Sequence, residues 1–273
     1  MAPPQFKDFD KTVSELLGDD YDSKCSLKVK SKAPHGVGLT ITTDYANSAL
    51  SGKVAAKWAH ESGFAIDKLE VNKNAGVAIE TSLKGAVPHM KFEFKGNDSN
   101  KGDLLATYSN DIATVVGQLD VAEFSGFNVS ALATTGSFAG GAAVAVSLGD
   151  SADVKKFDVA TSYNCDDCKV FTGLKISDKF ANYTASLGYK ACPAVSLGSE
   201  LNFKPESSAF SALVGGSYKC NPDTQMKAKV STEGALNFSV KQSLSNNCSI
   251  TSTLATSSKN FGDYKLGFVG NLG

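Results

Sequence analysis

The sequence predicts an all-β fold, a transmembrane β-barrel of about nineteen strands preceded by an N-terminal amphipathic helix. After residue 22, apolar and polar residues alternate in short runs such as "QMKAKV" (225–230), which is the period of a β-strand. Clusters of turn residues separate these runs every ~10–14 residues, and no linker or long insertion divides the chain. A single closed barrel of about nineteen strands cannot fill its interior with side chains, so it must enclose water.

The first element is the helix, in the stretch "PPQFKDFDKTVSELLG" (3–18). Apolar residues recur there at spacings of three and four and form one stripe. The side chains expected to pack along this stripe are Phe6, Phe9, Val13, Leu16 and Leu17. Two prolines suit the helix start and Gly18 suits its end. We therefore expect a helix and linker over residues 1–22 and a barrel over residues 23–273.

The strands follow in chain order, each as a short alternating run bounded by turn residues. Representative runs are 26–32, 37–45, 53–58, 77–84, 89–96, 127–134, 157–163, 182–190, 195–204 and 264–272. Because these runs continue without a break, they predict one up-and-down meander rather than two sandwiches joined by long crossover loops.

The two faces of these strands differ in charge. If Val, Leu, Ile and Phe define one face, the lysines on the other face are Lys28, Lys30, Lys53, Lys57, Lys84, Lys91, Lys95, Lys175, Lys190, Lys204, Lys227, Lys229, Lys241 and Lys265. Few strand acids join them: Glu80, Glu93, Asp120, Asp158 and Glu200. The other acids are expected mostly in turns, as at Asp98, Asp103, Asp150, Asp153, Asp166, Asp167 and Asp223. A basic pore lining favours anions, whereas the alternative is that the lysines only solubilise a water-facing sheet.

Composition excludes several classes of function. The 27 basic residues are all lysine and balance 28 acids, so bidentate arginine recognition is absent and we expect no nucleic-acid recognition. No Ser/His/Asp or phosphate-loop pattern appears, so the chain is predicted not to be an enzyme and to need no cofactor. No apolar segment resembles a secretory signal.

The six cysteines give no strong metal or disulfide pattern. They are Cys25, Cys165, Cys168, Cys192, Cys220 and Cys248. Cys165-Asp-Asp-Cys168 is a lone CxxC without nearby histidines, whereas a zinc site needs further ligands. We therefore predict no metal site and interpret this pair as two thiols in a turn.

The chain resembles the eukaryotic mitochondrial porins, the voltage-dependent anion channels of the mitochondrial outer membrane, over its whole length. The resemblance rests on the opening "MAPPQFKDFDKTVSELLGDDY", on "HGVGLT", on "NPDTQMKAKVSTEGALNFSVKQSL" and on the ending "YKLGFVGNLG". Nineteen is also the strand number known for the mitochondrial channel of this family, so the count and the resemblance are not independent. In the helix, Lys11 matches a family lysine and Asp8 an early acid, but Ser14 and Asp19 stand where the family has cations.

The resemblance implies a function and a site. It implies a voltage-gated, weakly anion-selective diffusion channel for ATP, ADP, phosphate and small anions in the mitochondrial outer membrane. It also implies a helix inside the lumen, with Lys11 among the pore-lining charges, and a parallel pairing of the strands near 26–32 and 264–272. The expected partners are the lipid bilayer, the permeating anions and possible further copies of the chain. A protein-import pore of the same barrel type and a soluble β-rich binding module are the alternatives.

Overall fold

The computed structural model describes residues 2–46, 49–148 and 152–273. Within them it contains one α-helix, α1 (Lys11–Gly18), two short 3-10 helices, η1 (Phe6–Asp8) and η2 (Pro34–Gly36), and nineteen strands. The first ten strands are β1 (Cys25–Lys32), β2 (Gly38–Ala46), β3 (Ala49–Ala59), β4 (Phe64–Asn72), β5 (Val77–Lys84), β6 (Met90–Asn97), β7 (Lys101–Ser109), β8 (Ala113–Asp120), β9 (Gly126–Thr135) and β10 (Phe138–Leu148). The other nine are β11 (Ala152–Cys165), β12 (Val170–Ser177), β13 (Asn182–Cys192), β14 (Val195–Lys204), β15 (Ala209–Asn221), β16 (Thr224–Ser231), β17 (Ala235–Ser245), β18 (Cys248–Ser257) and β19 (Asn260–Leu272). No helix in these ranges is long and apolar enough to cross a membrane.

The nineteen strands form a single sheet that closes on itself. Strands that follow each other in the chain are hydrogen-bonded neighbours, and β1 pairs with both β2 and β19. The prediction of a barrel with about nineteen strands is therefore confirmed. Because successive strands alternate in direction, an odd number of them makes β1 and β19 run the same way, as the resemblance implied.

Few apolar side chains are buried, and most of these belong to the N-terminal segment. Among the described residues, the buried apolar side chains are Phe6, Phe9, Val13, Leu17, Tyr21, Leu132, Ala160 and Phe171. Five of these eight precede the first strand. The sheet itself leaves most of its large apolar side chains exposed, which is the reverse of a soluble domain.

The chain divides into two compact units, and the N-terminal segment contributes to both. Unit 1 comprises Met1–Phe9, Val29–Thr43 and Ser51–Val159, and unit 2 comprises Asp10–Lys28, Asp44–Leu50 and Ala160–Gly273. In unit 1, the Thr114 hydroxyl donates a hydrogen bond to the Pro3 carbonyl at 2.7 Å.

The single helix expected over residues 3–18 is interrupted. The 3-10 turn η1 ends at Asp8, and α1 begins only at Lys11. Between them Asp10 leaves the helical conformation (φ −110°, ψ 21°), and its carbonyl accepts from the amides of Val13 and Ser14. Asp10 thus begins the new helix through its backbone carbonyl, while its side chain makes no capping hydrogen bond and its carboxylate accepts from the Ser186 hydroxyl at 3.4 Å.

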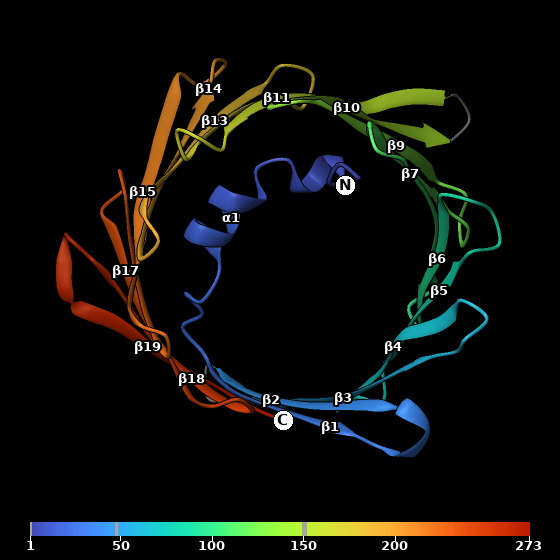
Figure 1. Ribbon diagram of the computed structural model, residues 1–273, viewed down its shortest axis with the longest axis horizontal. Helices are drawn as coiled ribbons and strands as arrows, with labels where there is room; N and C mark the ends of the chain where they lie inside the picture. The colour runs from blue at the N-terminus through green and yellow to red at the C-terminus, as the bar shows by residue number, and fades with distance from the viewer. Residues whose placement is uncertain (1, 47–48, 149–151) are drawn as a thin grey trace. The chain divides into compact units, whose positions relative to one another are not determined.

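Helix α1 packs on strands β13–β15 of unit 2 (Figure 1). Val13, which is fully buried, and Leu17 contact Phe171, and the half-buried Leu213 adds to this cluster. Three glycines leave room for the helix, because a Cβ atom on Gly188 would lie 3.1 Å from Val13 and one on Gly198 would lie 2.8 Å from Leu16. Gly215 similarly faces Leu17.

Replacing Gly198 tests whether this glycine surface positions the helix. We expect Gly198→Val to displace α1, because the new side chain collides with Leu16, and overpacking of this kind costs about 1–3 kcal/mol. Amide hydrogen exchange over residues 11–18 should then be about tenfold faster or more. Gly140→Val is the matched control, since nothing lies within 4 Å of a Cβ atom there. Equal exchange in the two variants would contradict the role of Gly198.

Candidate functional site

The polar face of unit 2 carries the lysines predicted from the sequence. Directly opposed residues of neighbouring strands share a face. Lys227 lies opposite Ser239 and Lys229 opposite Asn237, while Lys241 lies opposite Gln225. The same registers continue across the sheet and place these lysines on this face: Lys175, Lys190, Lys204, Lys227, Lys229, Lys241 and Lys265. Lys219, opposite Gln225, belongs with them but was not among the lysines predicted from the sequence, although its alternation with Val214 and Tyr218 could have identified it.

The opposite face of the same strands is apolar and exposed. Met226 pairs with Val240, and Ala228 pairs with Phe238. Met226 is 45% exposed and Phe238 46% exposed. A contiguous exposed apolar surface marks contact with a partner or a membrane, and alternation of an apolar outer face with a polar inner face is the pattern of a membrane barrel.

In unit 1, the predicted lysines also share one face, but acids accompany them. The registers place Lys53, Lys84, Lys91 and Lys95 on it. Lys57 follows by alternation along β3, with its side chain against Gly38. Strand β1 is divided between the units, with Lys28 in unit 2 and Lys30 in unit 1. Both lysines lie on the face of β1 opposite Leu27, which lies beside Gly270 on the apolar side.

Ion pairs occupy much of the polar face of unit 1. Lys53 lies 3.4 Å and Lys68 3.2 Å from the Glu70 carboxylate. Lys68 also reaches Glu80 at 3.8 Å. Lys91 binds Glu93 of its own strand at 2.7 Å.

The expected separation of lysines in strands from acids in turns is therefore only partly correct. Asp103 lies in β7 directly opposite Lys95, and Asp153 lies in β11. Asp150 falls outside the described residues. Strands β3–β8 contain seven lysines and six acids, whereas strands β12–β18 contain seven lysines and the single acid Glu200. The basic lining is thus a property of unit 2.

Two of the predicted pore lysines bind the end of helix α1. The Lys229 ammonium donates to the Leu17 carbonyl at 2.6 Å, and Lys227 donates to the carbonyls of Glu15 and Asp19, both at 3.3 Å. The last carbonyls of a helix lack intrahelical partners and carry partial negative charge. The two lysines therefore satisfy the C-terminus of α1, and the Lys227 side chain is only 9% exposed.

Asp20 completes this contact, which we call the helix anchor: Asp20, Lys227, Lys229 and Lys241. The Asp20 carboxylate lies 3.0 Å from Lys227 and 3.2 Å from Lys241. Burial alone would raise the pKa of Asp20, but the hydrogen bond and charge of Lys227, with Lys241, outweigh it and hold that pKa below its ordinary value. Lys229 also lies 4.2 Å from the centre of the Tyr21 ring. Burial, with the Asp20 charge, raises the pKa of Tyr21 to about 12.

The linker between the helix anchor and β1, residues 22–24, is hydrogen-bonded to strands β18 and β19. The Thr253 hydroxyl donates to the Asp22 carbonyl, and the Phe268 amide donates to the Lys24 carbonyl at 3.0 Å. Gly267 is required here, because any Cβ atom would collide with the Asp22 carbonyl.

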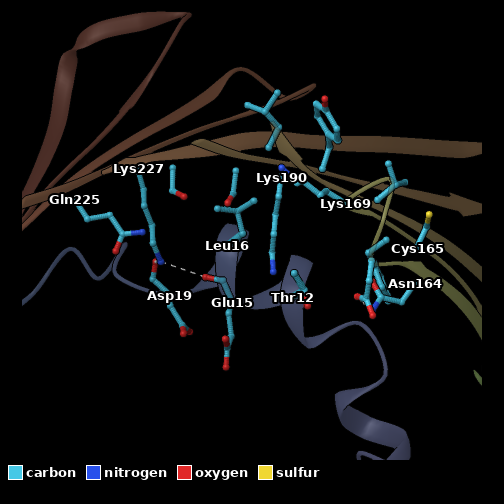
Figure 2. Close-up of a pocket in the computed structure, with 18 residues that line it drawn as sticks. Thr12, Glu15, Leu16, Asp19, Asn164, Cys165, Lys169, Lys190, Gln225 and Lys227 are labelled. Atoms are coloured by element: carbon cyan, nitrogen blue, oxygen red, sulfur yellow. Dashed lines mark hydrogen bonds between the residues drawn. The ribbon is translucent and has the colours of Figure 1, made fainter. Parts of the chain in front are cut away.

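Of the helix residues predicted from the sequence, Lys11 stays outside the anchor. It is largely exposed and forms an i,i+4 ion pair with Glu15 at 3.6 Å. Phe6 lies close to Gly141 of unit 1, and Phe9 is also buried. Leu16 lies over Gly198 and lines a cavity of about 360 Å³ beside α1, which Lys169 and Lys190 also line (Figure 2).

Comparison with known proteins relates these features to a family. Residues 2–267 match the family model described as eukaryotic porin. Mitochondrial outer membrane protein porin 1 of Arabidopsis thaliana is 24% identical, over 85% of this chain and 84% of its own length. Mitochondrial outer membrane protein porin 5 of Oryza sativa subsp. japonica is 26% identical, over 86% and 84%. A solved mutant of the Rh. blastica porin aligns with a TM-score of 0.49 and 9% identity, covering 85% of this chain and 90% of that one. The family match over nearly the whole chain shows that this protein belongs to the eukaryotic porin family.

Proposed function

We propose that the protein is a diffusion channel of the mitochondrial outer membrane, voltage-gated and weakly selective for anions, that passes ATP, ADP, phosphate and small anions. The observation that carries the proposal is the closed sheet with two unlike faces, one apolar and exposed and the other lined with lysine. Diffusion through water needs no catalytic group, which agrees with membership of a porin family.

Anion selectivity is supported by the unequal charge of the two units. Strands β12–β18 contain seven lysines and one acid, and four of these lysines lie outside the helix anchor, so this part of the wall keeps a net positive charge that concentrates anions. The nearly balanced charges of β3–β8 contribute little net potential. The resulting selectivity is weak and comes mainly from unit 2.

The N-terminal segment is the candidate for the charged element that responds to voltage. Residues 7–22 contain two lysines and six acids, so this segment is acidic while the wall that it contacts is basic. Each elementary charge moved through a potential of 100 mV changes the free energy by about 2.3 kcal/mol. Movement of this segment relative to the wall would therefore respond to voltage.

The alternatives from the sequence are less well supported. The exposed apolar side chains of the sheet oppose a soluble binding module. The curated relatives are named porins, which favours a metabolite channel over a protein-import pore.

Charge reversal of lysines that stand apart from the helix anchor tests the selectivity. Lys84, Lys95, Lys190 and Lys265 make no ion pair with any described residue. We expect the variant with all four changed to Glu to lower the anion-to-cation permeability ratio from above one to below one. The reversal potential of the purified protein in a planar bilayer under a salt gradient measures this ratio.

The matched control for that experiment is a lysine in a turn. Lys259 lies between β18 and β19, so Lys259→Glu changes the charge without changing the polar face. Its reversal potential should stay close to that of the unaltered protein. If the fourfold variant also kept the original potential, the assignment of the lysine face to the pore would be wrong.

Removing the Asp20 charge tests the helix anchor. Asp20→Asn breaks both ion pairs and leaves Lys227 partly buried without its carboxylate, a loss of about 1–3 kcal/mol. Because the pKa of Asp20 is lowered in the folded protein, its stabilising effect is present above the ordinary value of 3.8 and is lost as the pH falls through the lowered value. We therefore expect residues 11–18 of the variant to be mobile already at pH 7. In the unaltered protein, the same mobility should appear only below pH 3.8.

Nuclear magnetic resonance relaxation of the α1 backbone amides measures that mobility. Asp22→Asn is the control, since the Asp22 side chain is largely exposed and pairs at 3.9 Å with Lys24, outside the anchor. Rigid α1 amides in Asp20→Asn at pH 7 would show that the ion pairs do not hold the helix.

A further inference from the structure

The CxxC motif forms a disulfide in the structure. Cys165 ends β11, and Cys168 lies in the turn before β12. Their Sγ atoms are bonded, with the Cα atoms 5.2 Å apart, and the Cys168 amide also donates to the Cys165 Sγ at 3.0 Å. The two thiols that the sequence placed in a turn are therefore joined into a small ring that closes the β11–β12 hairpin.

This ring is accessible to small molecules, and one of its cysteines lines a cavity that α1 also lines. Cys168 is exposed and Cys165 is half-buried. Cys165 lines the cavity of about 360 Å³ together with Thr12 and Glu15 of α1 (Figure 2). The covalent state of the hairpin thus bears on the wall that α1 covers.

Other cysteines at the same edge of the sheet provide an internal comparison. Because neighbouring strands are antiparallel, the ends of β11, β13, β15 and β17 lie at one edge. Cys192 is the last residue of β13 and Cys220 lies next to the end of β15. Both are exposed and free. They experience the same solvent as the CxxC pair but have no adjacent thiol in their own hairpins.

We propose that Cys165 and Cys168 form a reversible dithiol–disulfide site, and that its state controls how firmly the β11–β12 hairpin supports helix α1. A small-molecule disulfide of the glutathione class oxidises the pair. The thiolate of one cysteine attacks this disulfide and releases one small thiol. The second cysteine then displaces the other, so that two protein thiols become one disulfide and one small disulfide becomes two thiols.

The disulfide state restricts the hairpin because the ring removes conformations that the open turn can reach. The wall beside Thr12 and Glu15 is then fixed, and α1 opens less often. Reduction frees the turn without breaking the helix anchor, which lies on strands β16 and β17. The expected effect is therefore a change in the local opening of α1 rather than its release.

Thiol counting on the full-length protein in detergent micelles tests the chemistry. The protein is equilibrated with reduced and oxidised glutathione at varied ratios, quenched in acid, alkylated and analysed by peptide mass mapping. As the proportion of oxidised glutathione rises, we expect the thiols of Cys165 and Cys168 to disappear together, because they form one intramolecular disulfide. Cys192 and Cys220 should give only alkylated or mixed-disulfide peptides. Alkylation of Cys165 and Cys168 at every ratio, or independent mixed disulfides on them, would overturn the site.

Serine variants provide the controls. In Cys165→Ser, the remaining Cys168 should behave like Cys192 and form a mixed disulfide. The double variant Cys192→Ser with Cys220→Ser should leave the oxidation of the CxxC pair unchanged. A shift of that oxidation in the double variant would show exchange among hairpins and would contradict a site confined to one turn.

Hydrogen exchange tests the link to the helix. We expect amides of residues 11–18 to exchange about twofold faster or more in the reduced protein than in the oxidised protein. Cys165→Ser should show the fast rate under both conditions. Equal rates in the reduced and oxidised protein would overturn the coupling to α1. Neither the thiol counting nor the hydrogen exchange depends on the ion selectivity of the channel. The outcome of both experiments is therefore separate from that of the proposed function.

Discussion

Pairing of the first strand with the last is the contact on which the rest of this structure depends. A lipid environment offers no hydrogen bonds to backbone amides or carbonyls, so a sheet that spans a membrane must have no open edge. The pairing of β1 with β19 supplies the missing neighbour for both strands. The residues that precede β1 are drawn along the same strands, since Asp22 and Lys24 bond to Thr253 and Phe268. Closure of the sheet therefore also directs the linker, and with it α1, onto the polar face of unit 2.

The helix meets this face through complementary shape and charge. Gly188, Gly198 and Gly215 leave space for three apolar side chains of α1, and the carbonyls at its C-terminus meet two lysines. Neither contact alone explains the docking. Glycines without an apolar helix would leave voids, and the ammonium groups without carbonyl and carboxylate partners would be partly buried and unpaired, which is costly. The acidic N-terminal segment and the basic wall stabilise each other.

The fold was largely predictable from the sequence, because its signal is local. A period of two over six or seven residues assigns both the strand and its faces, as residues 225–230 show. The partners of those side chains were not predictable. Lys229 and the Leu17 carbonyl are 212 positions apart in the chain, and a lysine on a polar face looks the same in sequence whether it faces water or a helix end. Asp103 was misplaced for a related reason. It follows a glycine near a cluster of turn residues, yet tertiary pairing with Lys95 extends the strand through it. The break at Asp10 was likewise not predictable, since the apolar spacing of residues 6–17 continues across it.

The helix anchor also determines which lysines of the polar face of unit 2 carry an unpaired charge. Lys227 is neutralised by Asp20 and shielded by α1, so its field in water is weak while the helix is docked. Lys190, Lys219 and Lys265 have no such partner among the described residues, and their charge reaches the solvent in the docked state. If α1 leaves the wall, the four acids Asp10, Glu15, Asp19 and Asp20 move with it, and the anchor lysines become unpaired. The polar face of unit 2 then becomes more positive than before. Under the proposed anion selectivity, a state with the helix released is therefore expected to prefer anions more strongly than the docked state.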